Sequence, residues 1–337
     1  MEFWIAGANV AGEAANIARQ AEREGLDGIS FGDTQCIAPD PYVGLTVAAS
    51  VTTRLKLLVG VTNPVTRDPA ITACSIASVQ IESQGRAVLG IGRGDSAVSK
   101  IGLRAGTVPQ FEEYLVRLQG YLSGHIVVRG GKNGSLEWLR SVSLPKVPVD
   151  VAATGPAVIA AAARQAERIS FNFGADGERI ARAMAQAREE RARTGRGALS
   201  FGIYLPVAPH PDIRAARQMV KGVVGVYTRF QAMPGHPQDQ VRPENARVIK
   251  AVGENYDNSR HGRADAAHIA LLEDDFIDRF AVVGPAERCV DRLRQLIALG
   301  LDRIMIVGPN RLAAEHYPES RRLLTEIVIP ELRRAAK

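Results

Sequence analysis

The sequence Leu57-Leu58-Val59-Gly60-Val61-Thr62-Asn63-Pro64-Val65-Thr66-Arg67-Asp68-Pro69 contains an apolar run that stops at a glycine and opens into a polar loop bounded by prolines, ahead of a helix-like segment. α/β barrels and doubly wound sheets build their active-site edges in this way. The stretch therefore predicts a β-strand whose carboxyl end lies at a functional edge. In a simpler interpretation it is an ordinary strand exit, in which Gly60 only relieves backbone strain.

A second apolar run ends in a comparable turn, within the sequence Ser83-Gln84-Gly85-Arg86-Ala87-Val88-Leu89-Gly90-Ile91-Gly92-Arg93-Gly94-Asp95-Ser96. Gly90, Gly92 and Gly94 alternate with the β-run and then with polar residues, which leaves backbone amides uncovered. Such a turn can approach an anion or a flat ring closely. The glycine spacing is not that of the dinucleotide-binding fingerprint.

Strand-like and helix-like segments alternate along the whole chain. The predicted strands are Glu2–Gly7, Gly28–Phe31, Leu55–Gly60, Ala87–Ile91, Val149–Ala152, Ile169–Phe173, Leu199–Val207 and Arg303–Val307. The predicted helices are Gly12–Glu24, Pro41–Val51, Pro69–Ser83, Val108–Leu122, Pro156–Glu167, Asp176–Arg193, a long region from Pro211, and Pro285–Leu299. Eight parallel strands with intervening helices predict a (β/α)8 TIM barrel in a single domain, 1–337. An open, doubly wound sheet is the alternative.

Two insertions interrupt this alternation. Residues 127–144 contain the turn Gly130-Gly131-Lys132-Asn133-Gly134 and predict a hairpin before strand five. Residues 234–281, after strand seven, are rich in Pro, Gly, His and charge, with helix-compatible stretches at Glu244–Glu254 and Asp265–Arg279. Long excursions of this kind commonly act as lids, substrate-binding elements or subunit contacts.

Composition excludes several classes of protein. No apolar run approaches the ~20 residues that span a bilayer, and the start at Met1 has no basic flank or cleavage site, so we expect a cytoplasmic protein without a membrane contact. The net charge is +6, but the basic residues are interleaved with acidic ones and aromatic residues are scarce, which argues against nucleic acid. Three widely spaced cysteines and unpaired histidines predict neither a disulfide framework nor a metal site.

Both quoted stretches resemble the luciferase-like flavin and deazaflavin oxidoreductases, particularly the branch that contains methylenetetrahydromethanopterin reductase. The resemblance implies a luciferase-like barrel and a non-prolyl cis peptide bond between Gly60 and Val61, whose bulge presses against the cofactor ring. It also implies that the turn after strand four binds the cofactor. The segment after strand seven is then expected to lie over the active-site mouth.

The residues expected to bind the cofactor lie at three strand ends: Gly60, Val61, Thr62 and Asn63; Gly92, Arg93, Gly94 and Asp95; and Ala152, Ala153, Thr154, Gly155 and Pro156. At the third end, Pro156 suits the first position of a helix, and the free amides of a helix start favour a phosphate. This end resembles the family's phosphate cradle. Simple helix capping by Thr154 is the alternative. Arg93 is expected to meet a phosphate or acidic group, or else to pair with Asp95 or Asp33.

Asp33, Thr34 and His210 are the candidate catalytic residues. Asp33 and Thr34 follow strand two, where many deazaflavin-dependent relatives carry an Asp-His pair. Because Thr34 replaces that histidine, we expect it only to orient the cofactor or substrate by hydrogen bonds. Asp33 can instead cap a local turn. His210 directly follows strand seven, although a lone histidine in a loop is usually just solvated.

The resemblance therefore implies an oxidoreductase that transfers a hydride between reduced coenzyme F420, a deazaflavin, and an unsaturated substrate with a C=C, C=N or C=O bond. The substrate is expected to be a small molecule or a peptide. An FMN-dependent monooxygenase using O2 is the first alternative, and a non-catalytic flavin-binding protein is the second. Because the family is usually dimeric or larger, we also expect a homodimer or higher homo-oligomer.

Overall fold

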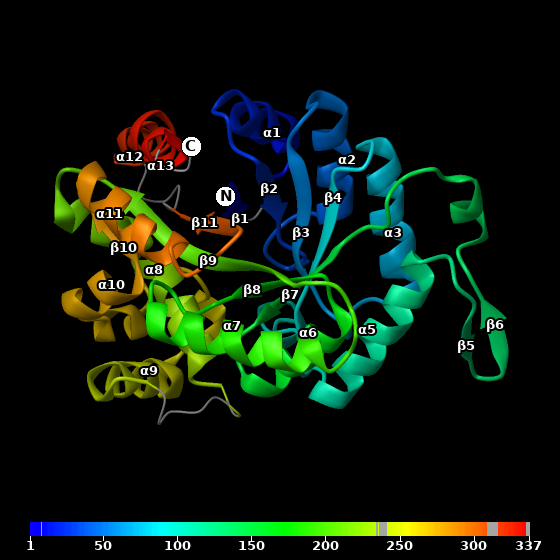
Figure 1. Ribbon diagram of the computed structural model, residues 1–337. Coiled ribbons are helices and arrows are strands. Elements are labelled where there is room, and N and C mark those ends of the chain that lie inside the picture. Colours follow the sequence, from blue (N-terminus) through cyan, green and yellow to red (C-terminus); the bar gives the residue numbers. More distant parts are fainter. Residues whose placement is uncertain (8, 234, 236–240, 309–315, 335–337) are drawn as a thin grey trace.

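Eight parallel strands close into a barrel in the computed structural model of this chain (Figure 1). The structure describes residues 1–7, 9–233, 235, 241–308 and 316–334. In their order around the barrel, the strands are β1 (Glu2–Gly7), β2 (Gly28–Phe31), β3 (Lys56–Thr62), β4 (Ala87–Ile91), β7 (Val149–Ala153), β8 (Arg168–Phe171), β9 (Ser200–Pro209) and β11 (Arg303–Val307). Pairing of β8 with β9 completes the ring, so the barrel is confirmed and the open sheet is wrong.

Alternate residues of each strand enter two different apolar layers. Leu57 and Val59 pack outward with the helices, whereas Leu58, between them, joins an inner cluster with Trp4 and Met305. This is the period of two that a strand imposes on its side chains. A short strand, β10 (Val282–Gly284), pairs in parallel with the carboxyl-terminal end of β9.

Helices surround the barrel (Figure 1). They are α1 (Ala14–Arg23), α2 (Pro41–Val51), α3 (Pro69–Glu82), the short α4 (Ser96–Ser99), α5 (Val108–Leu122), α6 (Pro156–Gln165), α7 (Gly177–Ala192), α8 (Ile213–Gln231), α11 (Ala286–Ile297), α12 (Tyr317–Leu323) and α13 (Ile329–Arg334), the last two joined by a π-helical turn, Leu324–Val328. Local signals set several starts, because the side chains of Asp40, Asp68, Asp176 and Asp212 cap the helices that follow them. No helix in the described ranges is both long and apolar enough to cross a membrane.

The segment before β7 projects away from the barrel as a hairpin (Figure 1). Strands β5 (Val127–Arg129) and β6 (Lys132–Gly134) pair in antiparallel fashion around Gly130 and Gly131, which have φ angles of 55° and 72°. A 3-10 turn, Glu137–Ser141, follows. Glycine adopts this left-handed backbone without steric cost, which allows the two-residue turn.

The segment after α8 contains α9 (Pro243–Asn255), 3-10 turns at Asn258–Arg260 and Ala267–Leu271, and α10 (Asp274–Phe280). Residues 234 and 236–240 of the predicted insertion lie outside the described residues. Only the second half of the helix-compatible stretch Asp265–Arg279 forms an α-helix, and its first half contains a 3-10 turn. Tertiary packing explains the difference: a Cβ atom on Gly225 of α8 would lie 2.4 Å from Ile269, so the turn is seated directly on that helix.

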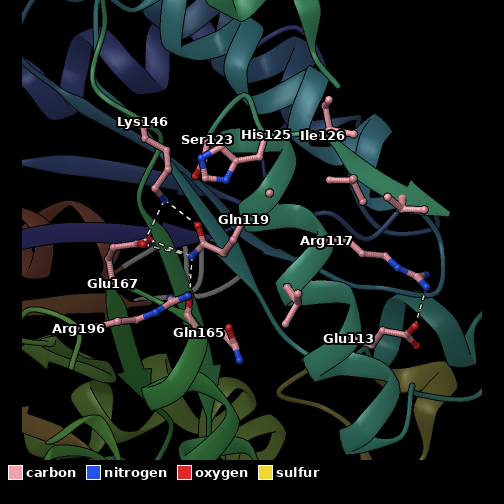
Figure 2. Close-up of a pocket in the computed structure, with 14 residues that line it drawn as sticks. Glu113, Arg117, Gln119, Ser123, His125, Ile126, Lys146, Gln165, Glu167 and Arg196 are labelled. Atoms are coloured by element: carbon pink, nitrogen blue, oxygen red, sulfur yellow. Dashed lines mark hydrogen bonds and ion pairs between the residues drawn. The ribbon is translucent and has the colours of Figure 1, made fainter. Parts of the chain in front are cut away.

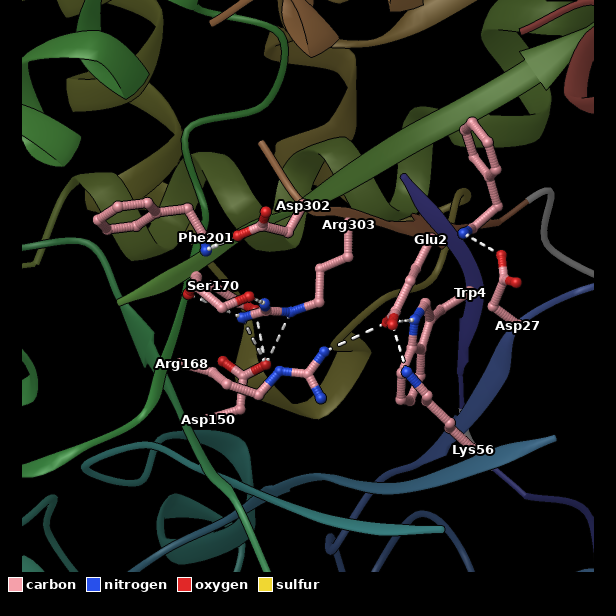
Figure 3. Close-up of polar contacts among 12 residues, drawn as sticks. Glu2, Trp4, Asp27, Lys56, Asp150, Arg168, Ser170, Phe201, Asp302 and Arg303 are labelled. Atoms are coloured by element: carbon pink, nitrogen blue, oxygen red, sulfur yellow. Dashed lines mark hydrogen bonds and ion pairs between the residues drawn. The ribbon is translucent and has the colours of Figure 1, made fainter. Parts of the chain in front are cut away.

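A buried network of charges fills the amino-terminal end of the barrel interior (Figure 3). Arg303 and Asp150, which are 1% and 2% exposed, form an ion pair of 2.8 Å, and Ser170 also donates to the same carboxylate oxygen. Glu2 accepts hydrogen bonds from Trp4 and Arg168. Burial lowers the pKa of Arg303, but the carboxylate of Asp150 opposes this effect. We interpret this network as part of the scaffold, because it lies at the end of the barrel that normally carries stability rather than chemistry.

Candidate functional site

Unpaired polar atoms gather around the carboxyl-terminal ends of the strands. Among the described residues, buried atoms there without a hydrogen-bond partner are Asn9 Oδ1, Ser30 Oγ, Tyr42 Oη, Asn63 Nδ2, Asp95 Oδ2 and Asn172 Oδ1. Buried polar groups in proteins are nearly always paired, so each such atom requires an explanation. A set of donors and acceptors at one edge of the barrel indicates a ligand that supplies their partners. This edge is also where barrels of this kind perform chemistry.

Asp33 connects the loop after β2 to the loop after β3. Its buried carboxylate oxygen Oδ2 accepts hydrogen bonds from Thr62 Oγ1, at 2.7 Å, and from Arg67 Nε, at 3.0 Å. Arg67 also donates to Asp40, at 2.5 Å, and lies over the Tyr42 ring, 4.7 Å from its centroid. Asp33 is therefore held by side chains of the neighbouring loop, and a simple turn cap does not describe it.

Tyr42 and Thr34 are the other polar side chains of this region. Burial and the nearby charge of Asp33 raise the pKa of the Tyr42 hydroxyl, so that it keeps its proton at neutral pH. Thr34 is half-buried, and its carbonyl accepts hydrogen bonds from the amides of Ile37 and Ala38. Within the described part of the chain, no hydrogen bond of the Thr34 hydroxyl is recorded.

The end of β3 forms the predicted bulge. The peptide bond between Gly60 and Val61 is cis, and the pairing of β3 with β4 shifts register between Val59 and Thr62. A Cβ atom on Gly60 would lie 2.0 Å from Ser30 Oγ, so any larger residue there would have to displace the Ser30 side chain. Just beyond the bulge, Asn63 Oδ1 accepts from the amides of Val65 and Thr66, both at 3.0 Å, which leaves Asn63 Nδ2 buried and unpaired.

The turn after β4 is joined to this bulge, because the Gly92 amide donates to the Thr62 carbonyl at 2.9 Å. Gly94 has a φ of 98°, a conformation that favours glycine. Arg93 Nε donates to the Gly106 carbonyl at 2.9 Å. The expected alternative pairings of Arg93 with Asp95 or Asp33 are not seen, because Arg229 and Arg67 occupy those carboxylates.

The end of β7 leads directly into α6. Gly155 is the N-cap residue, with φ of −87° and ψ of 149°, and Pro156 occupies the first turn. No side chain among the described residues caps this helix, so the alternative of capping by Thr154 is wrong. Val158 and Ile159 donate to the Gly155 carbonyl, at 3.1 and 3.0 Å, and Pro156 has no N–H group, so the Ala157 amide is the donor that this helix start offers to an anion. Ala152 and Ala153, just before this helix start, provide only methyl groups.

His210 lies between β9 and α12. Its Nδ1 accepts from the Asp212 amide at 3.1 Å, its Nε2 lies 3.3 Å from Glu319 Oε2, and its ring packs edge-on against His316 at 5.0 Å. Within the described ranges, none of these contacts of His210 involves Asp33, Thr62 or Arg67. The catalytic role of His210 therefore stays a prediction, and its observed contacts hold α12 against the barrel.

Three further side chains shape this edge but were not predicted from the sequence: Tyr42, Arg67 and Arg229. Arg67 lies within the quoted polar loop, so the loop itself was a usable signal. Arg229 lies inside α8, 134 residues from Asp95, with which it pairs. The sequence around Arg229 has the pattern of an ordinary amphipathic helix, so it gave no signal of this contact.

A groove of about 700 Å³ opens at a different place, beside the ends of α5 and α6 and the starts of β7 and β8 (Figure 2). Lys146 donates there to Gln119, at 2.8 Å, and lies 3.2 Å from Glu167. The groove belongs to the amino-terminal end of the barrel. We therefore place the functional site at the strand ends described above and not in this groove.

Comparison with known proteins relates this chain to the same family that the two quoted stretches resemble. The family model for luciferase-like monooxygenases matches residues 4–303. The 5,10-methylenetetrahydromethanopterin reductase of Methanolobus tindarius is 27% identical over 307 residues, which are 88% of this chain and 91% of that protein.

Two solved structures share the fold. The coenzyme F420-dependent tetrahydromethanopterin reductase from Methanopyrus kandleri has a TM-score of 0.75 at 22% identity, with 98% of this chain and 99% of that chain covered. An F420-dependent secondary alcohol dehydrogenase, solved with an F420-acetone adduct, has a TM-score of 0.75 at 14% identity, with 98% of each chain covered. At these identities the structural likeness shows the fold alone.

Proposed function

The chain belongs to the luciferase-like monooxygenase family, and from this premise we propose that it is an F420-dependent oxidoreductase. The proposed reaction transfers a hydride between reduced F420 and an unsaturated organic substrate with a C=C, C=N or C=O bond. The names of the two structural neighbours, which both include F420, support this choice of cofactor. The observation that carries the proposal is the set of buried, unpaired donors and acceptors around the Gly60–Val61 bulge.

The residues at the strand ends fit a deazaflavin. Gly60, Gly92 and Gly94 let the bulge and the turn after β4 pack closely on Ser30, Val61 and Val98, and this packing shapes the edge that we propose faces a flat ring. Asn63 Nδ2 offers a donor and Asn9 Oδ1 offers an acceptor to the polar edge of such a ring. The start of α6 can donate backbone N–H hydrogen bonds to the phosphate of the cofactor.

When bound, the deazaflavin supplies the hydride chemistry, and the side chains supply orientation and charge. Arg67 and Thr62 fix the Asp33 carboxylate, so this group enters the site in one orientation. The Tyr42 hydroxyl keeps its proton and can donate it as a hydrogen bond. Asp33 and Thr34 are the proposed residues for orienting the cofactor or the substrate.

Titration of the ligand-free protein with F420 and with FMN, followed by tryptophan fluorescence or calorimetry, tests the cofactor. We expect tighter binding of F420. Asn63→Asp keeps the oxygen that accepts from the amides of Val65 and Thr66, but replaces the unpaired Nδ2 donor with a second acceptor. It should weaken F420 binding about tenfold or more, because a buried polar group left without its hydrogen bond costs ~1–3 kcal/mol. Asn16→Asp, at an exposed position on α1, is the matched control and should bind like the wild type.

Micromolar binding of FMN without detectable binding of F420 would reverse the proposal in favour of the FMN-dependent monooxygenase. The description of the family as monooxygenases makes this the second candidate. Binding of either cofactor without turnover of any unsaturated substrate would favour a non-catalytic flavin-binding protein.

A further inference from the structure

Asp95, in the turn after β4, forms an ion pair with an arginine from a distant helix. Arg229, near the end of α8, donates from Nη1 to Asp95 Oδ1. Both side chains are largely buried, with exposed fractions of 15% for Arg229 and 16% for Asp95. Only one of the two carboxylate oxygens is used, because Asp95 Oδ2 is buried and has no hydrogen-bond partner among the described residues.

Arg229 is itself held from its other side by the segment that follows α9. Its guanidinium lies 4.9 Å from the centroid of the Tyr256 ring, a cation–π distance. Tyr256 Oη lies 2.9 Å from His261 Nδ1, and the Tyr256 ring packs against His268 with 4.2 Å between centroids. Burial lowers the pKa of both histidines, so both are mainly uncharged at neutral pH.

The same segment is seated closely on α8. A Cβ atom on Gly222 would lie 2.6 Å from the Gly262 carbonyl oxygen, and one on Gly225 would lie 2.4 Å from Ile269. The two glycines therefore allow the chain to pack against the helix without a gap. Contacts run without interruption from this segment through Tyr256 and Arg229 to Asp95, next to the proposed cofactor site.

We propose that Arg229 is a positioning residue that fixes Oδ1 of Asp95 and thereby presents Oδ2 as an acceptor for an N–H or O–H group of the bound ligand. An ion pair that uses only one oxygen leaves the other with its full capacity to accept a hydrogen bond. The inference rests on the proposed function, because the proposed ligand provides the missing donor. It assigns the segment after α9 a role in supporting the cofactor turn.

Four variants test this role through the affinity for F420: Arg229→Met, Arg229→Lys, Asp95→Asn, and the double variant Arg229→Met with Asp95→Asn. Arg229→Met should weaken F420 binding about tenfold, because the Asp95 carboxylate is no longer held in place and its charge-assisted hydrogen bond to the ligand is lost. Arg229→Lys keeps the positive charge and should restore most of the affinity. In the Asp95→Asn background, Arg229→Met should cause less than about a twofold further loss, because residues that act through one contact are not additive.

Amide hydrogen exchange of residues 92–99 in the ligand-free protein gives a second readout, independent of any cofactor. Arg229→Met should accelerate exchange in this turn. Arg247→Met is the matched control, because Arg247 of α9 pairs with Glu273 on the surface and is 73% exposed. It should leave both exchange and affinity unchanged.

An equal effect of Arg229→Met in the wild-type and Asp95→Asn backgrounds would overturn the inference, as would unchanged exchange in the turn. If the wild-type protein binds neither F420 nor FMN, the proposed function fails. The exchange measurement then still decides whether Arg229 positions the turn.

Discussion

At the scale of single residues, burial and partners decide what an arginine does in this protein. Arg67 and Arg229 each fix a carboxylate at the carboxyl-terminal edge of the barrel. Arg86 belongs to the quoted stretch around β4 that resembles the family. It instead donates to the carbonyls of Ala49, Thr52 and Leu55 near the end of α2. Desolvation lowers the pKa of Arg86. Its role is structural, whereas Arg93 is half-buried and donates to the Gly106 carbonyl in the loop that follows α4.

The start of α6 gives a prediction at this scale. Gly155→Val should weaken binding of F420 by about tenfold to a hundredfold, because a branched side chain would keep the phosphate from amides whose contacts are worth ~1.5–3 kcal/mol each. Valine can adopt the extended backbone observed at Gly155, so the fold should be retained. Fluorescence titration measures the affinity, and circular dichroism checks the fold.

Gly177→Val is the matched control, at the first turn of α7, where a Cβ atom would make an ordinary contact of 3.6 Å with Leu299. It should bind F420 like the wild type. Unchanged affinity in a folded Gly155→Val variant would mean that the phosphate is bound elsewhere.

At the scale of secondary-structure elements, ion pairs fix how the segment after α8 packs. Arg217 of α8 makes two hydrogen bonds of 2.8 Å to the carboxylate of Asp278 in α10. These bonds hold the pKa of Asp278 below its ordinary value. Both side chains are 19% exposed, so solvent screens the pair only partly.

Asp278→Asn should lower the free energy of unfolding by about 1–2 kcal/mol at pH 7. Because the folded-state pKa of Asp278 is depressed, its stabilising contribution is fully present above the unfolded-state pKa, near ~4, and is lost as the pH falls through the folded-state value. The difference between wild type and variant should thus be constant from pH 7 to about 5 and shrink below about 4. Urea unfolding at several pH values measures it.

Glu189→Gln serves as the control, because Glu189 is 70% exposed in its pair with Arg193. It should change stability by less than about 0.5 kcal/mol. If the difference in unfolding free energy between wild type and Asp278→Asn grew toward acid pH, it would contradict the lowered pKa of Asp278.

At the scale of the whole molecule, closure of the barrel separates two ends with different properties. The amino-terminal end is filled by the paired network around Arg303 and Asp150. The carboxyl-terminal end carries the group of unpaired polar atoms from several strand ends and the glycines of the bulge and the turn after β4, whereas among the described residues of the amino-terminal network Asp150 Oδ1 is the unpaired atom. A folded protein tolerates such unpaired groups where a ligand completes them, which is why the function is proposed at that end.

One face of the molecule also predicts an interaction with a second copy of the chain. Helix α2 contains no charged residue, and α3 contains only Glu82. Val43 and Ile71 on these helices are 67% and 56% exposed. Since a helix that is apolar all round is normally buried, we expect a homodimer through this face.

Val43→Arg should therefore shift the protein toward the monomer in sedimentation velocity experiments, because a charge would be buried in the interface. Ile327→Arg, in the π-helical turn after α12, is the control and should not change the oligomeric state. A wild-type protein that sediments as a monomer at micromolar concentration would refute the expectation.

Much of the fold was predictable because its signals are local. The ends of Pro41–Val51 and Val108–Leu122 match α2 and α5, since an N-cap side chain and a proline mark each start within a few residues of sequence. The glycine-bounded strand ends predicted the cis bond at Gly60 and the turn at Gly94 through their resemblance to a family. Eight strands in alternation with helices were enough to predict a barrel.

Tertiary structure alone decided which side chains meet. The pairs Arg67–Asp33 and Arg229–Asp95 join residues 34 and 134 positions apart, and no local pattern encodes such a distance. The first half of the helix-compatible stretch Asp265–Arg279 contains a 3-10 turn packed on Gly225 of α8, since tertiary packing can override helix propensity. The sequence by itself determined the barrel and indicated the strand ends at which we propose the function, since periodicity and turn chemistry act over a few residues. The partners of each charge at that edge depended on the closed barrel, which brings distant segments within hydrogen-bonding distance.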